Sequence, residues 1–187
     1  MQRELVERAQ AGDHDAFSVL VRASFPRLYG VANLILRDSE RAQDAVQEAL
    51  VLAWRHLRAL RDADAWDAWL HRLTVRACYR SARQVKRRDL VELHVVPDPE
   101  PAGAFDLSMS VAERDRMGRE LGRLPIDQRA VMVLHFYADL PLTEAAGILD
   151  IPVGTAKSRL HRGLEALRSA MSAEPEAAVS LVRERLA

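Results

Sequence analysis

The sequence LTEAAGILDIPVGTAKSRLHRGLEAL (Leu142–Leu167) predicts a short helix, a tight turn and a longer helix. On the longer helix, apolar residues recur at helical spacing along one face: Val153, Ala156, Leu160, Leu164 and Leu167. A second face carries hydroxyls and cations without a carboxylate, at Thr155, Ser158, Arg159 and Arg162, and Lys157 lies beside it. The segment Thr143–Leu149 is expected to brace this helix, as the first helix of a helix-turn-helix does.

A helix of this composition suits the major groove of DNA. Arginine can donate two hydrogen bonds to guanine, and lysine, serine and threonine can bind phosphates. The plainer interpretation is a solvated charged face, and the pattern alone does not separate the two.

The string Ile151–Arg162, IPVGTAKSRLHR, resembles the region-four helix-turn-helix of bacterial extracytoplasmic-function sigma factors. The resemblance extends upstream through LPIDQR (Leu124–Arg129) and VMVL (Val131–Leu134). It implies that the minus-thirty-five promoter element is contacted by Thr155, Lys157, Ser158, Arg159 and Arg162.

Three positions depart from the family pattern. Pro141 stands where a serine cap is usual, and Gly147 lies inside the first helix, where glycine costs about 1 kcal/mol relative to alanine. Asp150 replaces the usual turn glycine, and aspartate tolerates the left-handed conformation better than most residues.

Composition favours an all-α protein. The 187 residues are 49% hydrophobic but only 5% aromatic, and nothing alternates like a series of hairpins. The charged N-terminus has no signal-peptide core, no apolar run approaches the roughly 20 residues of a membrane span, and Cys78 is the single cysteine. We therefore expect a cytoplasmic chain without membrane insertion.

The charges are segregated although the net charge is zero. Residues 1–88 carry 16 basic and 11 acidic side chains, a net of +5, whereas residues 89–118 carry 2 and 7, a net of −5. From Arg72 to Arg88, seven cations follow one another without an acid: Arg72, Arg76, Arg80, Arg83, Lys86, Arg87 and Arg88. A solvated basic face is possible, but this density favours a polyanionic partner.

Four helices are expected in the N-terminal half, over Glu4–Ala11, from a cap at Asp13 to about Ile35, over Glu40–Arg58, and over Trp66–Arg88. Pro26 is expected to kink or split the second helix. Ser39 is expected to cap the third, and Arg58–Ala65 is interpreted as a loop. The residues expected to face the core are Phe17, Leu20, Val21, Leu28, Val31, Ile35, Ala42, Ala45, Val46, Ala49, Leu50, Ala53, Leu57, Trp66, Leu70, Leu73 and Ala77.

The segment Asp38–Trp54, DSERAQDAVQEALVLAW, resembles region two of the same sigma-factor family. That resemblance implies docking on the β′ clamp helices of RNA polymerase through Asp44, Gln47, Glu48 and Val51. WDAWLHRL (Trp66–Leu73) resembles the opening of the helix that reads and melts the minus-ten element. The implied minus-ten contacts are Arg58, Arg61, Arg72, Arg76, Arg80 and Arg83, whereas Trp66 and Trp69 are expected to lie in the core.

The predicted organisation is two small helical domains, 1–88 and 111–169, joined by an acidic proline-containing linker, 89–110, and followed by a tail, 170–187. The second domain is expected to have helices over Val111–Arg123 and Ile126–Tyr137, with Val131, Leu134 and Phe136 buried. The tail contains Pro175, and the residues that follow it are expected to form a short amphipathic helix.

No catalytic, metal-binding or cofactor motif is found, so we expect neither an enzyme, nor a metal, nor a cofactor. The resemblance implies an extracytoplasmic-function sigma factor that binds core RNA polymerase, through the β′ clamp helices and the β flap, and promoter DNA, and that is controlled by an anti-sigma factor. One alternative is a dimeric helix-turn-helix regulator that acts without polymerase, although no heptad seam is present. Another is an interaction protein whose helix-turn-helix has degenerated.

Overall fold

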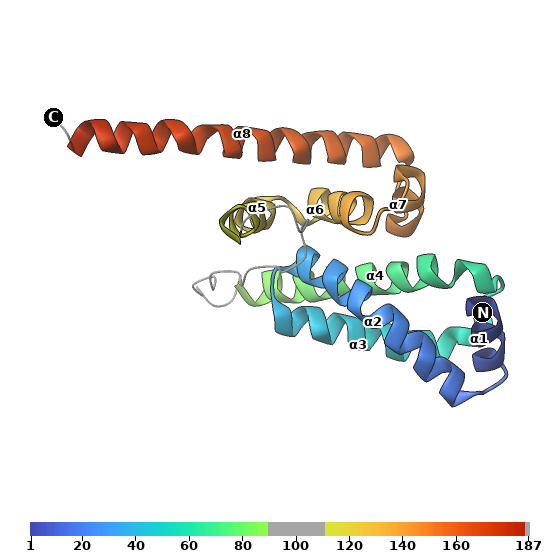
Figure 1. Cartoon of the computed structure of the whole chain (residues 1–187). Coiled ribbons are helices and arrows are strands. Elements are labelled where there is room, and N and C mark those ends of the chain that lie inside the picture. The colour runs from blue at the N-terminus through green and yellow to red at the C-terminus, as the bar shows by residue number, and fades with distance from the viewer. Residues whose placement is uncertain (90–110, 186–187) are drawn as a thin grey trace.

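The computed structural model describes the backbone of residues 1–89 and 111–185 and the side chains of residues 1–85 and 117–171. Every regular element in these ranges is helical. The N-terminal domain consists of α1 (Gln2–Gln10), α2 (His14–Leu36), α3 (Ser39–His56) and α4 (Trp66–Asp89), and α2, α3 and α4 pack against one another (Figure 1). The predicted all-helical, two-domain architecture is confirmed.

Helices α2 and α3 begin at aspartate caps. The Asp13 carboxylate accepts a hydrogen bond from the Ala16 amide at 2.9 Å, as expected. The cap of α3 is Asp38, which accepts from the Arg41 amide at 2.9 Å, so the assignment of Ser39 was wrong by one residue. The expectation that Pro26 splits α2 was also wrong, because Leu20 and Leu28 anchor the helix in the core on both sides of it.

The connection between α3 and α4 contains two short 3₁₀ turns, η1 (Leu57–Ala59) and η2 (Ala63–Ala65). The Gln10 side-chain amide donates to the carbonyls of Leu57 and Leu60, at 3.1 and 2.7 Å. The predicted loop is therefore structured and is tied to α1.

The core of the N-terminal domain is built mostly from the predicted residues. Trp66 and Leu70 of α4 are fully buried, and α3 buries a row of small residues at Ala42, Ala45, Ala49 and Ala53. Phe17, Leu50 and Leu73 are only partly buried against this cluster. Small side chains on α3 let α2 and α4 approach closely on either side of it.

The C-terminal domain consists of α5 (Val111–Arg123), α6 (Ile126–Met132), the π-helical turn η3 (Val133–Tyr137), α7 (Leu142–Leu149) and α8 (Val153–Arg185). The turn between α7 and α8 is made by Asp150 in the left-handed conformation, with φ 57° and ψ 46°. The predicted helix-turn-helix is confirmed as a structural unit.

Three expectations in this domain were wrong. Phe136 is 57% exposed rather than buried, because the Ala138 amide donates to the Val133 carbonyl and the wider π turn shifts the side-chain register. Val153 is 37% exposed, since it opens α8 at the edge of the apolar face. Residues 170–185 continue α8 through Pro175 instead of forming a separate helix.

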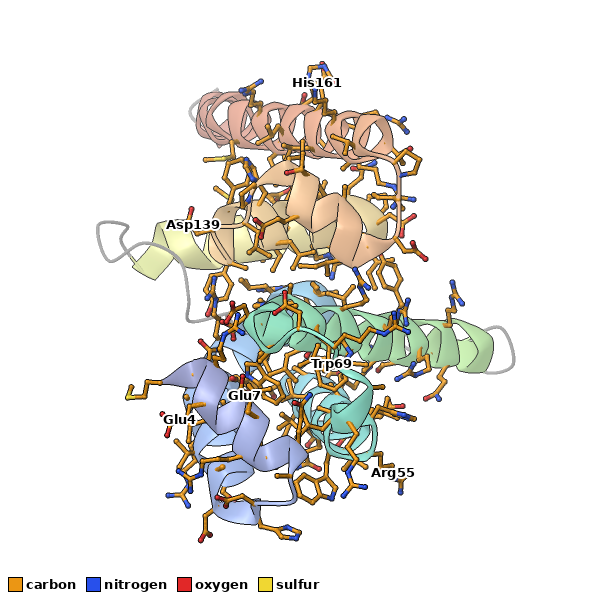
Figure 2. All side chains as sticks on the ribbon, turned by 90° about the vertical axis from the view of Figure 1, so that its right-hand side faces the viewer. Glu4, Glu7, Arg55, Trp69, Asp139 and His161 are labelled. Atoms are coloured by element: carbon orange, nitrogen blue, oxygen red, sulfur yellow. The ribbon has the colours of Figure 1, made fainter. Side chains whose placement is uncertain are left out.

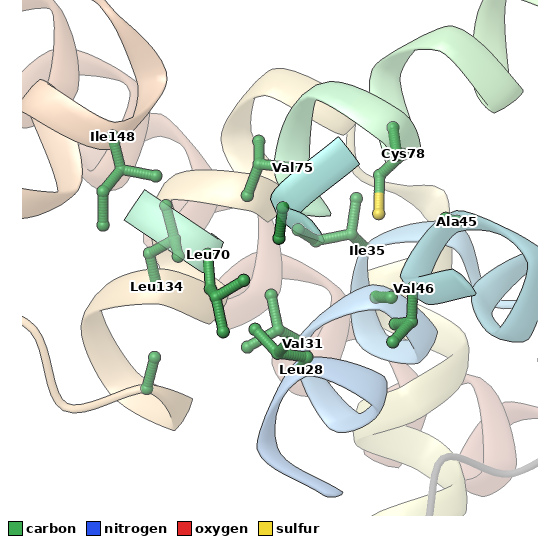
Figure 3. Packing of buried hydrophobic residues seen from close by; sticks show 14 of the residues in the cluster. Leu28, Val31, Ile35, Ala45, Val46, Leu70, Val75, Cys78, Leu134 and Ile148 are labelled. Carbon is green, nitrogen blue, oxygen red and sulfur yellow. The ribbon is translucent and has the colours of Figure 1, made fainter. Parts of the chain in front are cut away.

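The two domains share one apolar core. Leu134 and Ile148 of the C-terminal domain belong to the same buried cluster as Leu70 and Val75 of α4 and Ile35 of α2 (Figure 3). Helix α7 packs on α4, while α6 and η3 pack on α2. Helix α8 lies on the far side of α6 and α7, away from the N-terminal domain (Figure 1).

Helix α2 is the one helix in the described ranges that is long and apolar enough to cross a membrane by length and composition. Its apolar residues do not form an uninterrupted run, because Arg22 and Arg27 lie among them. In the fold, 44% of its most apolar window is buried, and its apolar side packs against α3 and α4. A core helix of a soluble protein passes the same test.

His71 on α4 is a buried polar residue of this core. We expect it to make the free energy of unfolding depend on pH in the acid range. Its Nδ1 lies 2.8 Å from the Asp67 carbonyl, to which it donates, and Nε2 is buried without a partner among the described residues. Burial, and secondarily the charge of Arg27, lower the pKa of His71 below its usual 6.5.

Because the unfolded chain takes up the proton first, the stability tied to neutral His71 is complete above about pH 6.5 and is lost as the pH falls towards the folded-state pKa. We expect His71→Leu to flatten this acid limb, measured by urea unfolding from pH 8 to pH 5. An acid limb identical to that of the wild type would contradict the assignment.

Candidate nucleic-acid and partner interfaces

The outer face of α3 carries the four residues predicted to dock on polymerase. Asp44, Gln47 and Glu48 are all exposed, and Val51 is 50% exposed beside them. They lie opposite the buried alanine row, so the face is presented by a helix that is fixed in the core. An apolar side chain surrounded by acids and an amide is a suitable contact for a basic partner surface.

Glu48 has a partner that the sequence did not reveal. Its Oε1 lies 2.9 Å from a guanidinium nitrogen of Arg80 on α4, and both side chains are about half exposed. This ion pair joins the predicted docking face to the basic face of α4. Because the pair is solvent-exposed, it contributes little to stability.

The basic face of α4 is exposed at the described positions Arg72, Arg76, Arg80 and Arg83, and Arg58 and Arg61 are exposed on the preceding connection. Lys86, Arg87 and Arg88 continue the helix, but their side chains lie outside the described residues. Of the described arginines, Arg72 reaches the C-terminal domain and donates to the Gly147 carbonyl at 3.0 Å.

Trp66 and Trp69 open the same helix but are not exposed as a base platform. Trp66 is fully buried. Trp69 (Figure 2) is partly buried, and its ring centroid lies 5.9 Å from that of Trp66. The prediction that Trp66 belongs to the core is confirmed, whereas Trp69 only packs against the core from its edge.

The recognition helix α8 presents its predicted residues unequally. Lys157 and Arg162 are exposed, whereas Thr155 and Ser158 are half-buried, and the Ser158 hydroxyl donates to the Thr155 carbonyl at 3.0 Å. His161 projects outward from the same helix (Figure 2) and lies 3.2 Å from Glu165.

Arg159 is held more firmly than its neighbours. Its side chain is 24% exposed, and its guanidinium lies 2.9 Å from the Asp127 carboxylate at the start of α6. The Asp127 carboxylate also lies near Tyr79 of α4. Burial, together with the charge of Asp127, raises the pKa of Tyr79 above its usual 10.

Arg129 is the structural residue that sequence reasoning missed. Its guanidinium donates to the carbonyls of Ile35, Gly122 and Leu124 at 2.6, 3.0 and 2.9 Å. It thereby joins the end of α2 to the connection between α5 and α6. Burial, and then the charges of Arg37 and Arg41, lower its pKa to about 10, so it remains charged at neutral pH. No pattern in the sequence marked it, because it follows Asp127 and Gln128 in the polar first half of α6.

Within the described residues, no group of three or more His, Cys, Asp or Glu side chains could hold a metal ion. Cys78 is buried, and burial raises the pKa of its thiol to about 12, which leaves it unreactive at neutral pH. The candidate interfaces in these ranges are therefore three exposed polar faces. They are the docking face of α3, the basic face of α4 and the outer face of α8.

A helix-turn-helix domain beside a helical domain with a basic face defines a DNA-binding protein of two helical domains. Comparison with known families matches residues 20–88 to sigma-70 region 2 and residues 114–167 to sigma-70, region 4. Mycobacterium tuberculosis SigM, an ECF RNA polymerase sigma factor, is 34% identical over 160 residues, covering 85% of this chain and 79% of the relative. The ECF RNA polymerase sigma-E factor of Escherichia coli is 33% identical over 180 residues, covering 87% and 90%.

The chain belongs to the ECF family of RNA polymerase sigma factors. Its fold is similar to that of a solved structure, the sigma factor RpoE in complex with the anti-sigma factor NepR from Bartonella quintana. The TM-score is 0.71 and the identity 24%, with 84% of this chain and 97% of that chain covered.

Proposed function

We propose that this protein acts in the cytoplasm as a promoter-specific initiation factor, with the polymerase-docking and DNA-binding roles divided among the three surfaces. The observation that carries the proposal is that all three are presented in chain order on helices with a buried side: α3 and α4 are anchored in the shared core, and α8 packs in separate apolar clusters of the C-terminal domain. We propose domain limits of 1–88 for region two, 89–110 for the linker, 111–169 for region four and 170–187 for the tail.

The docking role falls to Asp44, Gln47, Glu48 and Val51 on α3. Their exposure and their mixture of acidic, amide and apolar groups support contact with the β′ clamp helices of core polymerase. The β flap is the proposed polymerase contact of the C-terminal domain. An anti-sigma factor that covers these surfaces is the proposed regulator, by analogy with the relative solved in complex with NepR.

The minus-ten role falls to the α3–α4 connection and to α4. Arg72, Arg76, Arg80 and Arg83 form a cationic row that can follow a DNA backbone, with Arg58 and Arg61 beside the connection. The minus-thirty-five role falls to α8. Arg159 and Arg162 are the proposed base contacts, and Thr155, Lys157 and Ser158 are the proposed phosphate contacts.

The test is run-off transcription with purified core polymerase and a pool of genomic promoter fragments. Discrete new transcripts that require this protein are the expected result, and their upstream sequences would identify both elements. The absence of both transcripts and core binding would contradict the proposal. Binding of a palindromic DNA site by the protein alone would instead favour a dimeric helix-turn-helix regulator that acts without polymerase. No feature of the described residues favours that alternative.

The docking face can be tested separately with Asp44→Ala combined with Glu48→Ala. We expect core affinity to fall about tenfold or more, because two charged contacts are lost, while helix content stays unchanged because both side chains are exposed. Binding is measured by fluorescence titration and helix content by circular dichroism. Gln43→Ala, an exposed change on the same helix, is the matched control and should bind like the wild type.

If the double variant bound core polymerase like the wild type, α3 would not be the docking face. If it lost helix content, the two residues would be structural.

A further inference from the structure

Helix α1 holds the α3–α4 connection, to which the proposed function assigns part of the minus-ten role. The connection lies beside α1, at the end of the N-terminal domain where α4 begins (Figure 1). Within it, the exposed Arg58 and Arg61 lie between the buried Leu57 and Ala63. The two arginines are therefore presented by a short stretch of backbone that is anchored at both ends.

Gln10 is the residue of α1 that reaches this stretch. Its side-chain nitrogen Nε2 donates to the Leu57 carbonyl at 3.1 Å and to the Leu60 carbonyl at 2.7 Å. An amide NH₂ group has two donors, so it can serve both acceptors at once. Each carbonyl belongs to the peptide bond that leads into an arginine, Arg58 or Arg61. One side chain thus fixes the backbone just before both cations.

The position of Gln10 is itself fixed, because it lies at the corner between α1 and α2. Its neighbour Ala9 is buried, and Gly12 ends the helix with φ 102°, a conformation that favours glycine. The Arg8 guanidinium donates to the Asp13 carboxylate across the same corner, with Nε 3.0 Å from Oδ2. The donor therefore comes from a rigid part of the fold rather than from a free helix end.

A second tie joins α1 to the other half of the connection. The Arg3 guanidinium donates to both oxygens of the Asp64 carboxylate in η2, with Nε 3.0 Å from Oδ1. This pair is solvent-exposed and contributes little, whereas the bonds from Gln10 are partly buried. Among the described residues, the hydrogen bonds that reach the connection from another helix come from these two residues of α1. Gln10 is thus the stronger tie.

A fixed backbone matters at a surface that has to distinguish bases. Recognition groups discriminate only when they are held in one geometry, because mobile groups can shift to accommodate a wrong base. Ordering the connection in the free protein also lowers the conformational entropy that is lost when DNA binds. The two bonds from Gln10 supply this order at the residues next to Arg58 and Arg61.

We propose that Gln10 is a positioning residue for recognition of the minus-ten element. It acts through the Leu57 and Leu60 carbonyls and holds the connection in the conformation that distinguishes minus-ten bases. The inference rests on the proposed function. It requires that loss of the Gln10 donors impairs discrimination at the minus-ten element and leaves discrimination at the minus-thirty-five element unchanged.

The experiment compares Gln10→Met and Gln10→Glu with the wild-type full chain. Methionine keeps the unbranched stem but removes both donors. Glutamate keeps the shape but places acceptor oxygens against two carbonyls, so its effect should be larger. Both residues have a helix propensity close to that of glutamine. Gln43→Met is the matched control, because it makes the same change at an exposed glutamine on α3.

Two quantities are measured for each protein. Hydrogen–deuterium exchange reports the protection of residues 57–65. Transcription with core polymerase is measured on the promoter that the wild type uses most strongly, and on single-base variants of each element. The ratio of transcripts from the preferred and the substituted template does not depend on the amount of active protein. A variant that is merely less stable therefore keeps the wild-type ratio.

We expect faster exchange over residues 57–65 in both Gln10 variants and wild-type exchange in Gln43→Met. The minus-ten ratio should fall about fivefold or more, which corresponds to the loss of one hydrogen bond, while the minus-thirty-five ratio stays unchanged. Wild-type protection in Gln10→Met would show that the two bonds do not hold the connection. Faster exchange with an unchanged minus-ten ratio, or equal losses at both elements, would overturn the positioning role.

Failure of the proposed function would look different. If the wild type gave no transcripts, the proposed function and this inference would fall together. If the wild type gave transcripts and the Gln10 variants discriminated equally well at the minus-ten element, only the role of Gln10 would fall.

Discussion

Replacing Trp66 with alanine is expected to lower the free energy of unfolding of the N-terminal domain by about 3–5 kcal/mol. The side chain is fully buried, lies edge-on to Phe17 at a ring distance of 6.2 Å, and donates through Nε1 to the Ser24 hydroxyl at 3.4 Å. Truncation would leave a cavity where α4 begins against α2. Since domains are stable by only about 5–15 kcal/mol, the loss should be visible at once in the urea midpoint, followed by circular dichroism.

The comparison for this prediction is Trp69→Ala. Trp69 is only partly buried, so its truncation should cost clearly less. Equal losses for the two variants would mean that Trp66 is not the anchor of α4. Because α4 carries the basic face and α3 the docking face, we expect Trp66→Ala to weaken core binding and DNA binding together, unlike the exposed substitutions on α3.

The second large effect is expected for Arg129→Met. Methionine keeps an unbranched stem but leaves the carbonyls of Ile35, Gly122 and Leu124 without this donor. Each buried acceptor that loses its partner costs about 1–3 kcal/mol, and removal of a buried charge offsets part of the total. We expect a net loss of about 2–4 kcal/mol in the free energy of unfolding.

Urea unfolding of the whole chain measures this loss, with Arg129→Lys as the conservative control. Lysine keeps the charge but cannot reproduce the planar fork that reaches three carbonyls, so an intermediate stability is expected. Wild-type stability for Arg129→Met would show that these hydrogen bonds do not hold α6 in place.

Much of the fold could be predicted because its signals are local. Helical spacing of alanine and leucine placed α3 and α4 correctly, and Asp150 marked the turn before the recognition helix. Local capping rules were less exact, since Asp38 rather than Ser39 caps α3. The π turn that exposes Phe136 breaks the 3.6-residue period, so periodicity placed that ring on the wrong face.

The contacts that cross the chain could not be predicted in this way. Nothing near Glu48 in the sequence points to Arg80, and nothing near Gln10 points to Leu57. These pairs depend on how whole helices are placed, which a periodicity argument does not address. The same limit applies to Arg129, because the carbonyls that it contacts belong to the backbone of both domains.

The length of α8 has a mechanical consequence. Its 33 residues form a rod of about 50 Å that begins at the DNA-reading turn and continues past Pro175. A truncation near residue 170 would shorten this rod rather than remove a separate appendage. Conversely, a partner that bound the C-terminal end of α8 could act through this rigid helix as a lever. It would move the N-terminal end, which carries the DNA-reading residues, relative to the rest of the domain.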